Sequence, residues 1–212
     1  GLTLFGYDLL PIRVDRLSLV WGTIFHIAAF VCALYAIHVK DWVQHVSALL
    51  YVGAAIGAVF AGDLLTLFVY WELTAVSSAF LIWASRNERS YRAGMRYLII
   101  QVGSGVILLS GTLLHLRDTG SLSFVDAFHW HLPSTEDYFL GLNSPGTALI
   151  FIAFGIKAAF PLLHNWLEDA YPEATVTGTV FLSAFTTKLA IYALARGFPG
   201  TEILIWIGVA MT

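Results

Sequence analysis

The sequence contains few charged residues. Its 212 residues include 11 Lys and Arg and 14 Asp and Glu, together 12% of the chain, whereas soluble domains carry about 25%. So few charges cannot cover the surface of a soluble globule of this length. Hydrophobic residues make up 58%, and the mean hydropathy is +0.76. The composition excludes a soluble protein and indicates an integral membrane protein.

Cysteine and basic charge are also scarce. The single cysteine, Cys32, lies in an apolar run, which excludes a disulfide framework, a thiolate zinc site and an iron–sulfur cluster. A net charge of −3 excludes a polycationic nucleic-acid binder. The seven histidines show no spacing typical of haem or metal ligation, and no nucleophile–base motif stands out. We therefore expect no cofactor, no metal, no nucleic-acid partner and no catalytic activity of the chain by itself.

Long uncharged runs predict membrane-spanning helices, because a bilayer core about 30 Å thick needs about 20 apolar residues per helix. Pro161 falls inside one run and removes a backbone hydrogen bond, so we expect a broken helix that resumes at Leu162. Residues 203–212 predict the start of a seventh span in a chain that is a fragment of a longer protein. The expected fold is an all-α polytopic membrane protein, with residues 1–212 in one transmembrane domain. Six full spans are predicted, at 17–39, 46–62, 64–85, 97–116, 146–170 with the break, and 174–195.

Basic residues near span ends predict the orientation. The 86–96 loop carries four arginines against one acid, Glu88, and is expected in the cytoplasm. The polar, acidic 117–145 segment then forms an outer loop, and the same orientation places Arg13 and Arg16 outside. We expect a multi-pass protein of the inner (plasma) membrane, with the lipid bilayer as its surroundings.

Three ionisable residues lie inside the predicted spans: Glu72, Lys157 and Lys188. Each costs at least about 2.5–3.5 kcal/mol on insertion scales, so a function or a partner is the default interpretation. At 1.5 Å per residue they lie roughly 11–17 Å from the outer ends of their helices, in one layer near the bilayer middle. The alternative interpretation is that two of these residues form a structural ion pair and that one lysine extends its ammonium group to the membrane–water interface.

A glutamate and two lysines in one layer can form a set of coupled titrating groups. Lost hydration disfavours the protonated form of a buried lysine, and a nearby carboxylate favours it. Movement of Glu72 toward or away from Lys157 would therefore hold or release a proton toward Lys188. His164 follows the helix break by three residues and either extends this path or is a packed core histidine.

Two stretches resemble a known family. The span "GDLLTLFVYWELTAVSSAFLIW" and the segment "GIKAAFPLLHNWLEDAYPEATVTGTVFLSAFTTKLAIYALAR" are similar to the antiporter-like membrane subunits of complex I, membrane hydrogenases and Mrp-type Na+/H+ antiporters. The resemblance implies the third helix to the start of the ninth helix of that fold. It also implies that Glu72, Lys157 and Lys188 are the ion-carrying residues. "AYPEA" and "TTKLAIYALAR" look most like the D-type component of the Mrp antiporters.

The leading hypothesis is therefore a subunit of a multisubunit monovalent cation/proton antiporter that moves H+ and Na+ and assembles with other membrane subunits. The first alternative is a proton-translocating membrane subunit of NADH:quinone oxidoreductase (complex I) or a membrane hydrogenase, an enzyme only as part of its assembly. The second alternative is a scaffold subunit that transports nothing.

Overall fold

The computed structural model describes residues 2–4, 7–124 and 144–211. These residues form a helix bundle with one small sheet, an antiparallel hairpin of β1 (Leu2–Leu4) and β2 (Tyr7–Leu9). The sequence analysis did not predict this hairpin. The predicted outer loop falls largely on 125–143, outside the described residues.

Five helices are long and apolar enough to cross a membrane, which confirms the predicted polytopic fold within the described ranges. Four of them match the first four predicted spans within a few residues at most ends, and the fifth matches the last. The second and third are separated at Ala61–Asp63, where the sequence predicts a tight turn. The five are α1 (Arg16–Ala36), α2 (Trp42–Phe60), α3 (Leu64–Trp83), α4 (Glu88–Thr119) and α8 (Val176–Gly197).

Small polar residues set where these helices begin. Asp15, Asp41 and Asn87 each accept a hydrogen bond from a backbone amide in the first turn of α1, α2 and α4, as N-caps do. Asp63, the only charge between Val46 and Trp71, caps α3 through the Thr66 amide and also accepts from the Leu10 amide. The charge in this apolar stretch is thus a helix start rather than a residue inside a span.

The fifth predicted span is broken, as expected. Helix α6 (Pro145–Ala158) ends before Pro161, because Ala159 adopts a left-handed conformation with φ of 61°. Leu162 is also left-handed, with φ of 71°, so the next helix, α7 (Asn165–Ala170), begins three residues later than predicted. Its 14 residues give α6 a length of about 21 Å, shorter than a bilayer core of about 30 Å.

Two carbonyls at the break, those of Gly155 and Ile156, are bonded by the chain itself. The Phe160 amide donates to the Gly155 carbonyl at 3.0 Å. The indole of Trp166, in α7, donates to the Ile156 carbonyl at 2.9 Å. An irregular backbone at membrane depth needs such partners within the protein for its polar groups.

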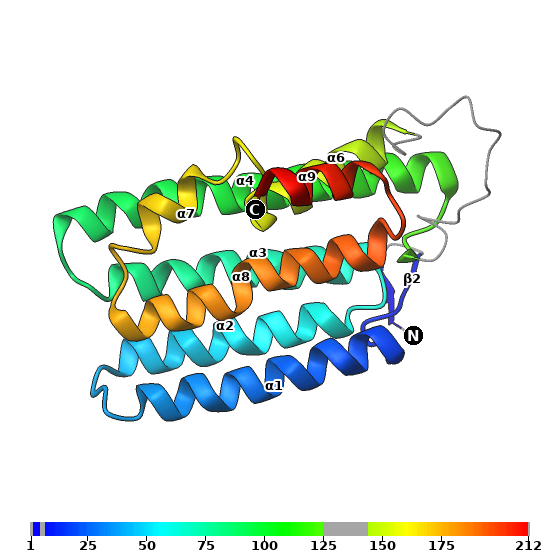
Figure 1. Cartoon of the computed structure of the whole chain (residues 1–212). Helices are drawn as coiled ribbons and strands as arrows, with labels where there is room; N and C mark the ends of the chain where they lie inside the picture. The colour runs from blue at the N-terminus through cyan, green and yellow to red at the C-terminus, as the bar shows by residue number, and fades with distance from the viewer. Residues whose placement is uncertain (1, 5–6, 125–143, 212) are drawn as a thin grey trace.

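The helices pack in chain order from α1 to α4, and α6 then packs against α4 (Figure 1). Helix α8 contacts α1, α2, α3 and α6 and so closes the bundle. Gly111 and Gly146 allow the close approach of α4 and α6, since a Cβ at Gly111 would lie 2.8 Å from the Gly146 carbonyl oxygen. Helix α9 (Ile203–Met211) follows α8.

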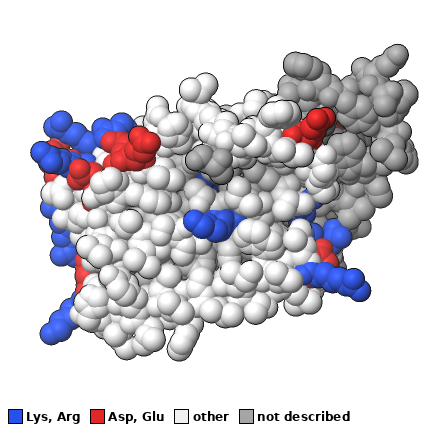
Figure 2. All heavy atoms as spheres, viewed as in Figure 1, with Lys and Arg blue, Asp and Glu red and all other residues white. Residues whose placement is uncertain are grey.

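Charged side chains gather at the two ends of the bundle, and a largely uncharged band lies between them (Figure 2). Large apolar side chains in this band are exposed, among them Phe30 at 70% and Leu49 at 68%. At one end, Arg86 pairs with Asp41 at 3.0 Å, and Arg96 pairs with Asp169 at 2.6 Å. This distribution fits a bundle whose middle contacts lipid.

Candidate functional site

Lys157 lies in the last turn of α6 and is 1% exposed. Its ammonium nitrogen Nζ donates to the Trp71 carbonyl oxygen at 3.2 Å and to Thr74 Oγ1 at 3.0 Å. Nζ also lies 4.5 Å from the centre of the Trp71 ring. The lysine is therefore held by neutral groups of α3. It also lies at the C-terminus of α6, where the helix dipole favours a positive charge.

A chain of hydrogen bonds fixes the surface on which Lys157 rests. The Trp71 indole donates to Ser104 Oγ on α4 at 3.1 Å, and Ser104 Oγ donates to the Ala153 carbonyl on α6 at 2.9 Å. Trp71 and Ser104 are fully buried. Three helices are thus linked within one turn of the lysine, which keeps its geometry defined.

Glu72 follows Trp71 on α3 but points to α4. Its Oε1 lies 1.4 Å from the position that a Cβ at Gly105 would occupy, so the carboxylate fills the space that this glycine leaves. Oε1 is buried and has no hydrogen-bond partner among the described residues. Within the part of the chain that the structure describes, Lys157 forms no ion pair of 4.0 Å or less. The two residues are therefore at one level of the bundle without a direct contact.

Lys188 and His164 lie at a second place, apart from the surroundings of Lys157. Both line a cavity of about 570 Å³ beside the helix break, together with Pro161, Trp21 and Thr187. Lys188 is exposed along the described chain, and His164 Nε2 lies 3.7 Å from Glu168 Oε1. The sequence analysis expects the three charges in one layer near the bilayer middle; among the described helices, Lys157 is buried and Lys188 is exposed.

Residues that the sequence analysis did not single out also carry buried polar atoms. Tyr97 on α4 shares a hydrogen bond of 2.8 Å with Ser78, and Tyr51 on α2 shares one of 2.5 Å with Thr186. Gln101 on α4 is fully buried, and neither its Nε2 nor its Oε1 has a partner among the described residues. The sequence signal that could have identified Gln101 is a polar amide inside the predicted span 97–116, which has no charged residue.

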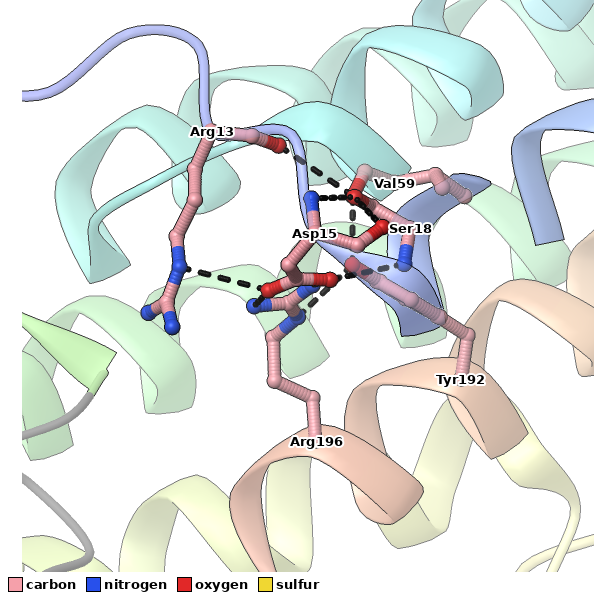
Figure 3. A network of polar contacts seen from close by, with 6 residues as sticks. All are labelled: Arg13, Asp15, Ser18, Val59, Tyr192 and Arg196. Atoms are coloured by element: carbon pink, nitrogen blue, oxygen red, sulfur yellow. Dashed lines mark hydrogen bonds and ion pairs between the residues drawn. The ribbon is translucent and has the colours of Figure 1, made fainter. Parts of the chain in front are cut away.

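A separate charged cluster lies at the opposite end of the bundle from the Arg86–Asp41 pair. Arg196, near the end of α8, donates to both carboxylate oxygens of Asp15 at 2.9 and 3.0 Å and to Tyr192 (Figure 3). Tyr192 donates to the Val59 carbonyl of α2. Burial raises the pKa of Asp15, but the hydrogen bonds from Arg196 and the Ser18 amide outweigh it and lower this pKa from 3.8 to about 2. The cluster ties α1, α2 and α8 together.

Comparisons with known proteins agree with this architecture. The family profile described as "NADH:quinone oxidoreductase/Mrp antiporter, TM" matches residues 61–210, which hold the broken helix and all three charged residues. The chain is 28% identical over 228 residues to NADH-quinone oxidoreductase subunit M of Escherichia coli K12, covering 97% of this chain and 43% of that protein. It is 33% identical over 159 residues to the A component of the Na+/H+ antiporter of Bacillus subtilis 168, covering 73% of this chain and 19% of that protein.

A solved structure shows the same fold. The Mrp complex from Dietzia sp. DQ12-45-1b aligns with a TM-score of 0.76 and 26% identity, over 94% of this chain and 38% of that chain. The chain spans less than half the length of the curated relatives it matches first. With the profile covering most of its residues, the chain belongs to the NADH:quinone oxidoreductase/Mrp antiporter transmembrane family.

Proposed function

We propose that this chain moves protons as part of a multisubunit monovalent cation/proton antiporter, with Na+ as the exchanged cation. The observation that carries the proposal is Lys157, an ammonium group fully buried at membrane depth and held only by a carbonyl and a hydroxyl. A buried ionisable group with this environment is a functional candidate by default. The likeness to a component of an Na+/H+ antiporter favours antiport.

Glu72 is the proposed partner of Lys157. A carboxylate that rotates from Gly105 toward the lysine would favour the protonated ammonium, and one that rotates back would leave the charge uncompensated. The two residues lie at the same level, because Lys157 contacts the carbonyl of Trp71, the residue before Glu72. A modest side-chain movement would therefore change the protonation of Lys157.

The proton would leave Lys157 through the helix break. The cavity beside Pro161 is lined by Ala158, the residue next to Lys157, and also by His164 and Lys188. Lys188 is the proposed next carrier, and His164 the proposed extension of the path. In this arrangement, the break presents backbone polar groups to the cavity, where a continuous helix would present only side chains.

We further propose that the 86–96 segment faces the cytoplasm of a cell with an inner (plasma) membrane, on the basis of its four arginines. Other membrane subunits of the same complex are the proposed partners. The likeness to the D-type component of the Mrp antiporters, which rests on "AYPEA" and "TTKLAIYALAR", is part of the same proposal.

The decisive test measures proton flux in vesicles that contain the full complex, with Na+, K+ or Li+ supplied in turn. Lys157→Ala should abolish cation-driven proton movement in assembled complexes. Lys40→Ala is the matched control, because Lys40 lies exposed between α1 and α2 and its removal changes the net charge equally. Undiminished transport by Lys157→Ala would instead support a scaffold role.

A redox-driven proton pump is the second candidate, favoured by the likeness to NADH-quinone oxidoreductase subunit M. The same vesicles distinguish the two. Proton uptake that requires NADH and quinone, and that no cation gradient can drive, would assign the chain to a redox complex. Proton movement driven by a cation gradient alone would assign it to an antiporter.

A further inference from the structure

Gln101 is the most unusual uncharged residue of the bundle. Its side chain is 0% exposed, and both amide atoms lack a hydrogen-bond partner among the described residues. A glutamine amide offers two donors and one acceptor oxygen, and buried polar groups are almost always hydrogen-bonded to protein or to ordered water. Packing alone does not account for an amide at this position.

The helix contacts place Gln101 at the level of Lys157. On α4, Ser104 contacts Trp71 of α3 and Ala153 of α6. Both neighbours run antiparallel to α4, as the Ser78–Tyr97 and Gly111–Gly146 contacts also show. Three residues back along α4, at Gln101, the facing positions are therefore Thr74 on α3 and Ile156 on α6. Thr74 is the hydroxyl that binds Lys157 Nζ.

Gln101 is also one helical turn from the Glu72 carboxylate. Glu72 Oε1 lies at Gly105, and residues four apart on a helix are neighbours on one face. Glu72 Oε1 and the Gln101 amide supply three of the four buried polar side-chain atoms that lack a partner in the described chain; the fourth is Thr201 Oγ1. Unsatisfied donors and acceptors are thus concentrated at the face of α4 that carries Gln101 and Gly105.

We propose that Gln101 binds water between Glu72 and Lys157 and is a positioning residue for the coupling of these two charges. This inference rests on the proposed function. The amide does not titrate, so it cannot carry the proton. The amide can donate to the Glu72 carboxylate and to a water oxygen, and its own oxygen can accept from a water. Such a water would bridge Glu72 and Lys157, which do not contact each other directly.

The test compares Gln101→Met with the parent complex in vesicles. Methionine is close to glutamine in shape and keeps the packing, but it forms almost no hydrogen bonds. We expect Gln101→Met to assemble normally and to lose transport by about tenfold or more, as the loss of one charge-assisted hydrogen bond implies. Gln101→Asn, which keeps a shorter amide, should retain more transport than Gln101→Met.

Thr112→Val is the matched control. Thr112 is also fully buried on α4, but its hydroxyl donates to the Leu108 carbonyl of its own helix at 2.8 Å. Removing this hydroxyl should leave transport unchanged. If Gln101→Met transports as well as the parent, the positioning role is wrong.

Two further measurements separate this inference from the proposed function. Lys157→Ala is measured in parallel: loss of transport in Lys157→Ala together with full transport in Gln101→Met would refute only the role of Gln101. If Gln101→Met fails to assemble, a density map of the parent complex that resolves ordered waters decides the question. Water bonded to Gln101 and Glu72 supports the inference, and an amide surrounded only by apolar atoms overturns it.

Discussion

Gly105→Ala tests the position of the Glu72 carboxylate with one methyl group. The added Cβ would lie 1.4 Å from Glu72 Oε1 and 2.5 Å from the carboxyl carbon, whereas real Cβ contacts are essentially never below 3.0 Å. Oε1 must therefore move by about 1.6 Å, the difference between 3.0 Å and its 1.4 Å distance from the added Cβ. A misplacement of about 1 Å in a reacting group can reduce a rate by about 100-fold. We expect Gly105→Ala to reduce proton transport by about 10- to 100-fold.

The substitution should not weaken the helix. Alanine is favoured over glycine by about 1 kcal/mol in a helix interior, so α4 itself gains stability. Gly103→Ala is the matched control, since it lies two residues away on the same helix and a Cβ there meets nothing within 4 Å. It brings the same gain in helix propensity without touching Glu72.

The assay is proton flux in vesicles, normalised to the amount of assembled complex. Adding Glu72→Asp to Gly105→Ala shortens the acid by one methylene and reduces the clash, so it should recover part of the lost transport. Parent-level flux in Gly105→Ala, or an equal loss in Gly103→Ala, would refute the idea that Glu72 must occupy the space beside Gly105.

Three further predictions concern the charged residues. A double-mutant cycle on Glu72 and Lys157 should show an interaction energy of about 0.5–3 kcal/mol in transport, and additive losses would remove the pair from the mechanism. Lys188→Arg should impair flux nearly as much as Lys188→Ala, because arginine keeps its proton; near-parent flux with arginine would make Lys188 an electrostatic fixture. The lowered pKa of Asp15 implies stability that is present above about pH 3.8 and is lost as the pH falls through about 2. Allowing for the partly exposed carboxylate, this amounts to about 1–2 kcal/mol in pH-dependent unfolding, and Asp15→Asn should not show it.

The membrane fold was predictable because its signal is long-range and redundant. Each span is a long apolar run with few or no charges, and a helix satisfies all of its backbone hydrogen bonds in lipid. The runs end close to where polar caps such as Asp41 and Asn87 begin the next helix. The helix break was predicted from Pro161, but its extent was not. Two left-handed residues, Ala159 and Leu162, delay the restart to Asn165, and nothing in their side chains favours positive φ.

The arrangement of the site was less predictable, because depth along a helix does not determine the direction of a side chain. Glu72 and Lys157 were expected at one level, and Lys157 donates to the carbonyl of Trp71, the residue before Glu72. The sequence did not indicate that Glu72 would face Gly105. Lys188 was expected in the same buried layer, yet it lies exposed beside the cavity. Which face of α8 is covered depends on packing between segments far apart in the chain.

Two kinds of buried polar side chain can be distinguished in this bundle: those whose donor is bonded within their own helix, and those that have no partner among the described residues. Ser77 donates to the Leu73 carbonyl, and Thr112 donates to the Leu108 carbonyl, so the hydrogen of each hydroxyl is bonded within its own helix. The single donor of each hydroxyl is used within the helix, which leaves only its oxygen as an acceptor. Glu72 Oε1 and both amide atoms of Gln101 differ, because they are buried and have no hydrogen-bond partner among the described residues. A proton path is therefore to be sought where the helices fail to satisfy their own polar side chains, and on α3, α4 and α6 that place is the surroundings of Lys157.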